Sequence, residues 1–229
     1  MGLNNEHAMS SAIVVDIETV GIPDAALYLE PVQQDKRLTD PIKIEWDIKV
    51  KTAEQLASCS LDWNVGRIAA IGVSVDGGPV QAWACPDEDT EAEAIKAFWV
   101  FARHKTIVGF NVKAFDLRFL IRRSQLLGLK YPDLDMGKYT KRGIVDLYQE
   151  LTFYDGLYDK GAMRRNLKSF CRRFGIPVND DINGADIPAL VEAGAWDQVL
   201  VHVRSDVTMT AALAQKLGVI RPALQEAIL

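Results

Sequence analysis

Two acidic residues stand two positions apart in a run that is otherwise apolar. Asp16 and Glu18 lie in residues 13–19, whose sequence is IVVDIET. If this run forms a β-strand, both side chains project from one face, because side chains alternate along a strand. Two buried carboxylates repel each other unless a cation lies between them, and Mg²⁺ and Mn²⁺ prefer such oxygen ligands. An acid pair at a strand end can also be a solvated terminus, so only further acids would indicate a metal site.

Two other segments place an acid on a predicted helix. In residues 108–117 (VGFNVKAFDL), a strand runs into a helix that has Asp116 in its first turn. Near the end of the chain, His202 and Asp206 are four residues apart in a helix and share one face. Each segment also has an ordinary structural explanation. Asp116 favours the helix dipole, Asn111 caps or turns the chain, and Asp206 is a surface acid.

The hydrophobic pattern predicts the elements that position these residues. β-branched runs bounded by turn residues predict strands at residues 11–17, 67–75, 80–85, 106–110 and 143–148. Apolar residues at helical spacing predict helices at residues 91–103, 115–127, 167–174, 187–192 and 196–217. The predicted order begins with three strands, continues with alternating helices and strands, and ends with helices. This order is typical of an α/β fold in which helices flank a mixed five-stranded sheet.

The length of 229 residues suits one hydrophobic core. We expect a flexible tail at residues 1–10 and a single domain at residues 11–229. Residues 22–64 depart from the regular pattern, since they form a long segment with three prolines, and we predict an insertion of loops and one short helix over the site. No apolar run is long enough to span a membrane and the N-terminus is polar, which predicts a soluble, cytoplasmic protein.

The net charge of −5 is unevenly distributed along the chain. Residues 113–173 carry 14 lysines and arginines and 7 aspartates and glutamates. The rest of the chain therefore carries 12 basic and 24 acidic residues. Basic pairs in this middle segment, among which we single out Arg164 and Arg172, indicate contacts to a phosphate backbone. Such pairs are commonly solvated helix faces. A basic segment beside a metal site nevertheless supplies the local positive charge that a protein of negative net charge requires to attract nucleic acid.

The three acidic segments resemble, in this order, the motifs of the DEDD (DnaQ-like) 3′→5′ exonuclease superfamily, which has a ribonuclease H-like fold. The most specific motif is residues 109–120 (GFNVKAFDLRFL). Residues 62–72 (DWNVGRIAAIG), 145–147 (VDL) and 181–185 (DINGA) also resemble stand-alone relatives of the family-B DNA polymerase proofreading exonuclease. The motifs span residues 13–210, nearly all of the chain.

The resemblance implies a two-metal site that hydrolyses the terminal phosphodiester of a DNA 3′ end, single-stranded by preference, to nucleoside monophosphates. The implied ligands of two divalent cations, Mg²⁺ or Mn²⁺, are Asp16, Glu18, Asp116 and Asp206. The residues implied in substrate binding are Thr19, Val20, Asn111 and Phe115. Phe115 fits the hydrophobic core equally well. The implied partner is nucleic acid, with a DNA polymerase or repair complex as a further candidate.

His202 departs from the superfamily pattern. The superfamily divides by the residue before its last Asp, which is a Tyr four positions earlier or a His five positions earlier. His202 stands four positions before Asp206, so a histidine occupies the tyrosine register and the subgroup stays open. An imidazole, with an unperturbed pKa of about 6.5, is suited to accept a proton near neutral pH. We predict that His202 is the general base or orients the attacking water; the alternative is that Asp206 acts without it.

Three other functions remain open from the sequence. A 3′→5′ exoribonuclease is one, because four acids hydrolyse RNA and DNA alike. A non-catalytic nucleic-acid-binding or scaffold module that retained the fold is another. A ribonuclease H-type endonuclease or resolvase is the third, although the Asn111-x-x-x-Phe115-Asp116 arrangement favours the exonuclease branch. The resemblance to proofreading domains favours DNA over RNA.

Overall fold

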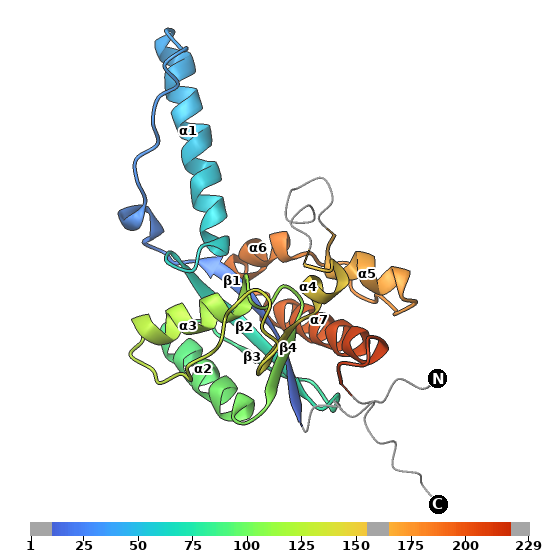
Figure 1. Cartoon of the computed structure of the whole chain (residues 1–229). Helices are drawn as coiled ribbons and strands as arrows, with labels where there is room; N and C mark the ends of the chain where they lie inside the picture. Colours follow the sequence, from blue (N-terminus) through green and yellow to red (C-terminus); the bar gives the residue numbers. More distant parts are fainter. Residues whose placement is uncertain (1–10, 155–164, 221–229) are drawn as a thin grey trace, which may run out of the picture.

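The computed structural model describes residues 11–154 and 165–220, and the predicted tail at residues 1–10 lies outside them. A five-stranded sheet with the strand order β3-β2-β1-β4-β5 forms the centre (Figure 1). Its strands are β1 (Ala12–Gly21), β2 (Gly66–Val75), β3 (Gln81–Ala84), β4 (Thr106–Gly109) and β5 (Ile144–Asp146). β1 pairs antiparallel with β2 and parallel with β4, β2 pairs antiparallel with β3, and β4 pairs parallel with β5. The predicted mixed sheet is confirmed.

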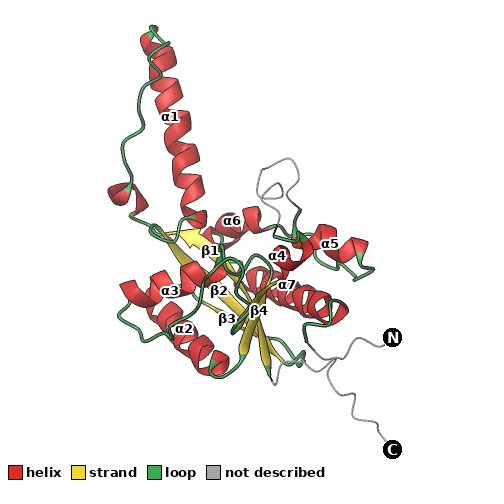
Figure 2. Cartoon of the chain, in the orientation of Figure 1, coloured by secondary structure: helices red, strands yellow, loops and turns green. Residues whose placement is uncertain are grey.

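Helices cover both faces of the sheet (Figure 2). On one side lie α2 (Glu88–Ala102) and α3 (Asp116–Leu126), and on the other lie α5 (Leu167–Arg173) and α7 (Trp196–Lys216), with α6 (Ile187–Glu192) packed against α7. The strand predicted to end at residue 148 ends at Asp146, because the Asp146 carboxylate caps a short helix, α4 (Leu147–Leu151). Within residues 11–154 and 165–220, no helix is both long and apolar enough to cross a membrane.

β1 divides its side chains between two cores. Ile13, Val15 and Ile17 pack in a buried cluster with α2 and α3. Ala12 and Val14, which point the other way, pack in a second cluster with α5 and α7. A slip of one residue would exchange the two faces and place buried aliphatic side chains, worth about 1.5–3 kcal/mol each, against the wrong layer. The register of β1, and with it the direction of its two acids, is therefore firmly fixed.

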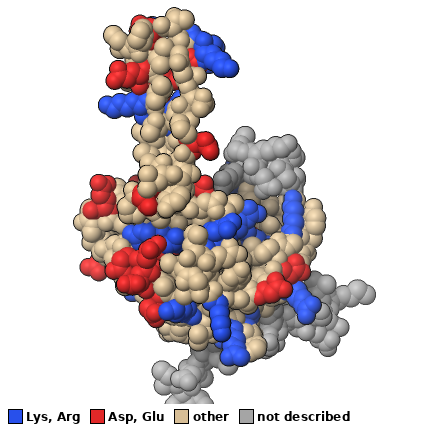
Figure 3. All heavy atoms as spheres, turned by 90° about the vertical axis from the view of Figure 1, so that its left-hand side faces the viewer, with Lys and Arg blue, Asp and Glu red and all other residues tan. Residues whose placement is uncertain are grey.

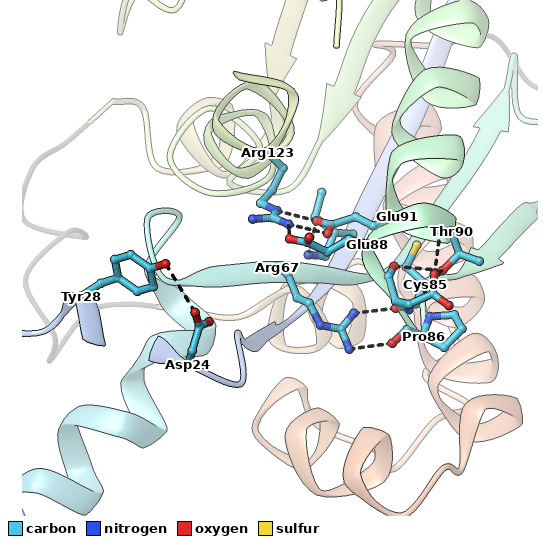
Figure 4. A network of polar contacts seen from close by, with 11 residues as sticks. Asp24, Tyr28, Arg67, Cys85, Pro86, Glu88, Thr90, Glu91 and Arg123 are labelled. Carbon is cyan, nitrogen blue, oxygen red and sulfur yellow. Dashed lines mark hydrogen bonds and ion pairs between the residues drawn. The ribbon is translucent and has the colours of Figure 1, made fainter. Parts of the chain in front are cut away.

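A buried ion-pair network ties α2 and α3 to β2 (Figure 4). The guanidinium of Arg123 on α3 donates to both carboxylate oxygens of Glu91 on α2, each at 2.8 Å, and to Glu88 at 2.9 Å. Glu91 Oε1 also accepts from the backbone N–H of Ile68 in β2 at 2.8 Å. Arg123 is 3% exposed and Glu91 is 0% exposed, so neither charge has water as an alternative partner.

Arg123→Ala is expected to lower the free energy of unfolding by about 3–5 kcal/mol, because it leaves the Glu91 charge buried and unpaired. The matched control is Arg122→Ala, one residue away, where the side chain bonds Gln125 at the surface and its loss costs under about 1 kcal/mol. Urea unfolding of both variants measures the difference. Equal losses in the two variants would contradict the role given to this network.

The segment at residues 22–64 differs from the predicted insertion of loops with one short helix. It contains 3₁₀ turns at Ala25–Tyr28 and Ser58–Leu61 and a helix of 17 residues, α1 (Pro41–Ala57). Residues 22–57 form an arm that projects from the body of the molecule (Figure 1). The helix of the arm points away from the sheet and does not lie over it.

The sequence pattern explains why the length of α1 was wrongly predicted. Its apolar residues stand at every second position from Ile42 to Val50, a strand-like alternation, and none of the residues of α1 is buried. The helix instead depends on its first turn, where Asp40 accepts a hydrogen bond from the backbone N–H of Ile42 at 2.9 Å and Pro41 supplies a suitable backbone angle. Capping rather than an apolar face defines this helix.

Candidate active site

Asp16 and Glu18 lie on the face of β1 that α7 covers. The residues that β1 turns toward this side are Ala12, Val14, Asp16, Glu18 and Val20. The three apolar members pack in cores that include α7, so the two acids interrupt a buried stripe. Glu18 is 7% exposed. The strand therefore presents two adjacent carboxylates inside the protein, an arrangement that is costly without a counter-charge.

Gly72 of β2 lets α7 approach the sheet closely enough to bring His202 and Asp206 to these acids. A Cβ atom at Gly72 would lie 2.9 Å from Val207 Cγ2 and 3.0 Å from Val203 Cγ2, both on α7. Real Cβ atoms do not tolerate such distances without movement of a neighbour. Glycine at this position thus sets the spacing between the sheet and the helix that carries the last two members of the site.

Gly72→Ala is expected to destabilise the fold by about 1–3 kcal/mol, because α7 must move outward. Since His202 and Asp206 move with the helix, divalent-cation affinity is expected to fall as well. Thermal unfolding and calorimetric cation titration measure the two effects. Gly184→Ala serves as the stability control, because an added Cβ there meets no atom within 4 Å. Unchanged stability and cation affinity in Gly72→Ala would show that this contact does not position the helix.

Asp116 enters the site from the first turn of α3. Its Oδ1 accepts a hydrogen bond from the backbone N–H of Ile17 at 3.1 Å, which holds the carboxylate against β1. Asn111, in the preceding turn, adopts the left-handed conformation with φ of 62°. Asp146 accepts from the backbone N–H groups of Asn111 at 3.0 Å and Lys113 at 3.1 Å. Asp146 therefore fixes the turn that delivers Asp116.

Burial disfavours the charged form of all four carboxyl groups. It raises the pKa of Asp16, Glu18 and Asp206 above the ordinary range, and for Asp16 and Glu18 the charges of neighbouring acids add to the effect. Burial raises the pKa of Asp116 to about 8, although hydrogen bonds from backbone N–H groups oppose the change. Among the described residues, the buried Oδ1 atom of Asp206 has no hydrogen-bond partner. A divalent cation fits this cluster, since it would offset the charge and bind the free oxygen.

His202 stands between the cluster and a fifth acid, Asp180. Its Nδ1 is hydrogen-bonded to Asp180 Oδ2, and its Nε2 lies 3.4 Å from Glu18 Oε1. Asp180 also accepts from the backbone N–H of Ile182 at 2.8 Å and lies 3.7 Å from Lys168 Nζ. Although burial raises the pKa of Asp180, its hydrogen bonds to His202 and Ile182 hold the pKa below the ordinary value. Asp180 was not among the site residues predicted from the sequence.

A cleft of about 670 Å³ opens over these groups. Its lining brings together eight of the predicted site residues, which are Asp16, Glu18, Thr19, Asn111, Phe115, Asp116, His202 and Asp206. Further residues in the lining include Ser60, Leu61, Phe110, Tyr148, Arg165, Asn166 and Lys168. Of the segment predicted to lie over the site, the residues in the lining are thus Ser60 and Leu61, at the base of the arm. The cleft combines buried acids with aromatic and basic side chains.

Two predicted substrate residues are not part of this lining. Val20 is buried, in a cluster with Val203 of α7 and Ile187 of α6, where it continues the apolar stripe of β1. Arg172 is exposed on α5. Arg164, a third predicted substrate residue, lies outside the described residues.

The excess of basic residues at 113–173 does not produce one basic face in the view of Figure 3. There, lysines and arginines are interspersed with aspartates and glutamates over the body below the arm. Positive side chains in the cleft itself come from Arg165 and Lys168. Attraction of a polyanion would therefore depend on local contacts at the cleft more than on a long-range field from this face.

Comparison with known proteins gives a family and a fold. A family model described as the RNase_H superfamily matches residues 59–218, a range that includes Asp116 and Asp206 and begins after β1. The structure resembles that of the family B DNA polymerase from the hyperthermophilic archaeon Pyrobaculum calidifontis, with a TM-score of 0.58 and 19% sequence identity. The match covers 90% of this chain and 24% of the polymerase, so this chain spans about a quarter of that protein. No curated protein matches the sequence. The chain belongs to the RNase H superfamily, and its sheet flanked by helices is the ribonuclease H-like fold.

Proposed function

We propose that this chain is a divalent-metal-dependent 3′→5′ exonuclease that degrades DNA from single-stranded 3′ ends to nucleoside monophosphates. Membership of the RNase H superfamily supports nuclease activity in general, and RNase H-like nucleases usually use divalent metals. The observation that carries the proposal is the convergence of four carboxylates from β1, α3 and α7 in one cleft beside aromatic and basic side chains. Acids at these positions also match the motif order of the exonuclease branch.

In this proposal the divalent cations are held by Asp16, Glu18, Asp116 and Asp206. Two such cations would activate the attacking water and stabilise the charge that develops on the departing 3′ oxygen. The protein contributes rigidity to this arrangement. The Ile17 N–H holds one Asp116 oxygen, the Asp146 carboxylate fixes the turn before α3, and Gly72 sets the position of α7. Glu18 and Asp116 are buried, so water competes little for their carboxylate oxygens.

Substrate binding in the proposal uses the rest of the cleft. Phe110 and Phe115 offer aromatic surfaces on which bases stack, each contact being worth about 1–3 kcal/mol whatever the sequence. Arg165 and Asn166, before α5, offer donors for phosphate oxygens.

The other predicted substrate residues divide into two groups. Thr19 keeps a proposed role beside the terminal nucleotide, Asn111 keeps a proposed role in lining the substrate path, and Arg172 keeps a proposed contact to the backbone outside the cleft. Val20 contributes packing under the acids instead. The likeness to a family B DNA polymerase favours DNA as the substrate and a polymerase or repair complex as a partner.

The experiment that tests this proposal digests end-labelled single-stranded DNA, duplex DNA and RNA in parallel, with Mg²⁺ or Mn²⁺ and with a chelator. A covalently closed DNA circle is included because an exonuclease must leave it intact. The expected result is metal-dependent release of mononucleotides from DNA 3′ ends. Faster digestion of RNA than of DNA would reassign the substrate to RNA, and nicking of the circle would indicate an endonuclease. If no substrate is cleaved under any condition, the exonuclease proposal is wrong and the non-catalytic binding module is the remaining interpretation.

A further inference from the structure

The environment of His202 differs from that of a histidine that only accepts protons. Its side chain is 3% exposed, and both ring nitrogens face carboxylates. Nδ1 is hydrogen-bonded to Asp180 Oδ2, while Nε2 lies 3.4 Å from Glu18 Oε1. Nδ1 also lies 4.0 Å from Asp206 Oδ1, the buried oxygen that has no hydrogen-bond partner among the described residues. The imidazole is therefore part of the carboxylate cluster.

The contact at Nδ1 determines what Nε2 can do. A carboxylate accepts hydrogen bonds, so Asp180 favours the tautomer that carries its proton on Nδ1. Asp180 is held in place by the backbone N–H of Ile182 at 2.8 Å and by the ammonium group of Lys168, whose Nζ also donates to the Asp180 carbonyl at 2.9 Å. The lone pair of Nε2 is thereby directed into the cluster. A histidine whose second nitrogen donates to a fixed carboxylate is the usual arrangement of a metal-bound histidine.

The acids around the imidazole have the spacing of a coordination site. One potential ligand atom from each of Glu18, His202 and Asp206 lies within 4.8 Å of the others. This set contains an imidazole nitrogen as well as carboxylate oxygens. Mg²⁺ is bound mainly by oxygen, whereas imidazole suits the first-row transition metals, among which Mn²⁺ also accepts carboxylates.

We propose that His202 is itself a metal ligand through Nε2, that Asp180 is the positioning residue that orients it, and that this site prefers Mn²⁺ to Mg²⁺. The inference rests on the proposed metal-dependent nuclease function and assigns His202 a role other than the general base predicted from the sequence. Lys168 supports the arrangement in two ways, because its Nζ lies 3.7 Å from Asp180 Oδ2 and also donates to the backbone carbonyls of residues 180 and 182.

Cation titration by calorimetry, with the full chain and without nucleic acid, tests the ligand set. His202→Gln is expected to raise the Mn²⁺ dissociation constant about 100-fold and to change that for Mg²⁺ less than about threefold, so that the preference disappears. Asp180→Asn is expected to weaken Mn²⁺ binding about 10–100-fold, as loss of an orienting carboxylate does in other metal sites. The matched control is Asp181→Asn, an exposed neighbour, which should bind both cations as the wild-type chain does.

Pulsed electron paramagnetic resonance of bound Mn²⁺ supplies a readout that does not depend on affinity or on turnover. The wild-type chain should show the nitrogen hyperfine coupling of a directly bound imidazole, and His202→Gln, loaded at saturating Mn²⁺, should lack it. Bound Mn²⁺ without nitrogen coupling in the wild-type chain would overturn the inference.

Other outcomes separate this inference from the proposed function. If His202→Gln retains full Mn²⁺ affinity and loses only turnover, the general-base role stands and metal ligation is wrong, while the exonuclease proposal survives. If the wild-type chain binds neither cation, the proposed function itself fails. Circular dichroism of each variant shows whether it is folded, and Asp180→Asn gives a second test should His202→Gln not fold.

Discussion

Asp116→Asn is expected to reduce turnover at least about a thousandfold and, at the same time, to make the metal-free protein more stable. The loss of activity follows from removal of one proposed metal ligand, since a thousandfold corresponds to about 4 kcal/mol of transition-state stabilisation. The gain in stability follows from burial, which raises the pKa of Asp116 to about 8 and so opposes its charge. Asparagine keeps an oxygen that can accept from the Ile17 N–H, and it has no charge to bury.

Melting temperatures in chelator at pH 8 and initial rates in Mn²⁺ measure the two halves of this prediction on one preparation. Asp133→Asn is the matched control, because Asp133 is exposed on the loop after α3 and lies outside the cleft lining. It should change neither quantity. Should Asp116→Asn melt at a lower temperature than the wild-type chain in chelator, the carboxylate would be a stabilising group and the electrostatic account of the cluster would fail.

The second large effect is a loss of stability of the metal-free protein as the pH rises from about 4 to about 8. The unfolded chain releases the Asp116 proton near pH 4, whereas the folded chain keeps it until about pH 8. Between these values the folded state binds more protons, so the free energy of unfolding falls with rising pH. One such group contributes about 1.4 kcal/mol per pH unit, and the raised pKa values of Asp16, Glu18 and Asp206 act in the same direction.

Urea unfolding at pH 5, 6, 7 and 8, in chelator and in Mn²⁺, measures this dependence. The difference between the wild-type chain and Asp116→Asn isolates the contribution of Asp116, since other titrating groups cancel. We expect the difference to grow with pH in chelator. Mn²⁺ should stabilise the wild-type chain more at pH 8 than at pH 5, because the cation binds the ionised carboxylates. A difference that is flat with pH would contradict the raised pKa of Asp116.

The sheet and the meeting of the acids were predictable because local patterns encode them. Alternation along residues 13–19 places Asp16 and Glu18 on one face whatever the strand packs against. Asp116 lies at the junction between strand β4 and helix α3. Since β4 runs parallel to β1, this junction lies at the carboxyl-terminal end of their paired residues. The spacing of four between His202 and Asp206 puts both on one side of α7. Periodicity of two or about 3.6 residues was enough to identify each of these features.

Contacts between loops were not predictable in the same way. Asp180 reaches His202 across 22 residues of sequence, from a loop without periodicity, and the adjacent DINGA motif indicates this region only through its resemblance to proofreading exonucleases. The sequence places Asp146 in a predicted strand. Its importance lies in the hydrogen bonds that it accepts from the backbone of Asn111 and Lys113, and these depend on the packing of β4 beside β5. The prediction of one short helix in the arm was wrong for a different reason. The apolar residues of α1 alternate as in a strand and none of its residues is buried, so the sequence lacks the periodicity of a long helix.

The most direct measurement uses a 5′-labelled single-stranded DNA oligonucleotide with Mn²⁺, digested by the wild-type chain and by Asp206→Asn purified in the same way. The wild-type chain should produce a ladder that shortens by one nucleotide at a time from the 3′ end, with nucleoside monophosphates as the released product. Asp206→Asn and the wild-type chain in chelator should leave the oligonucleotide intact. Equal digestion by the wild-type chain and Asp206→Asn, or cleavage at internal positions, would contradict the assignment of these carboxylates to a 3′→5′ exonuclease.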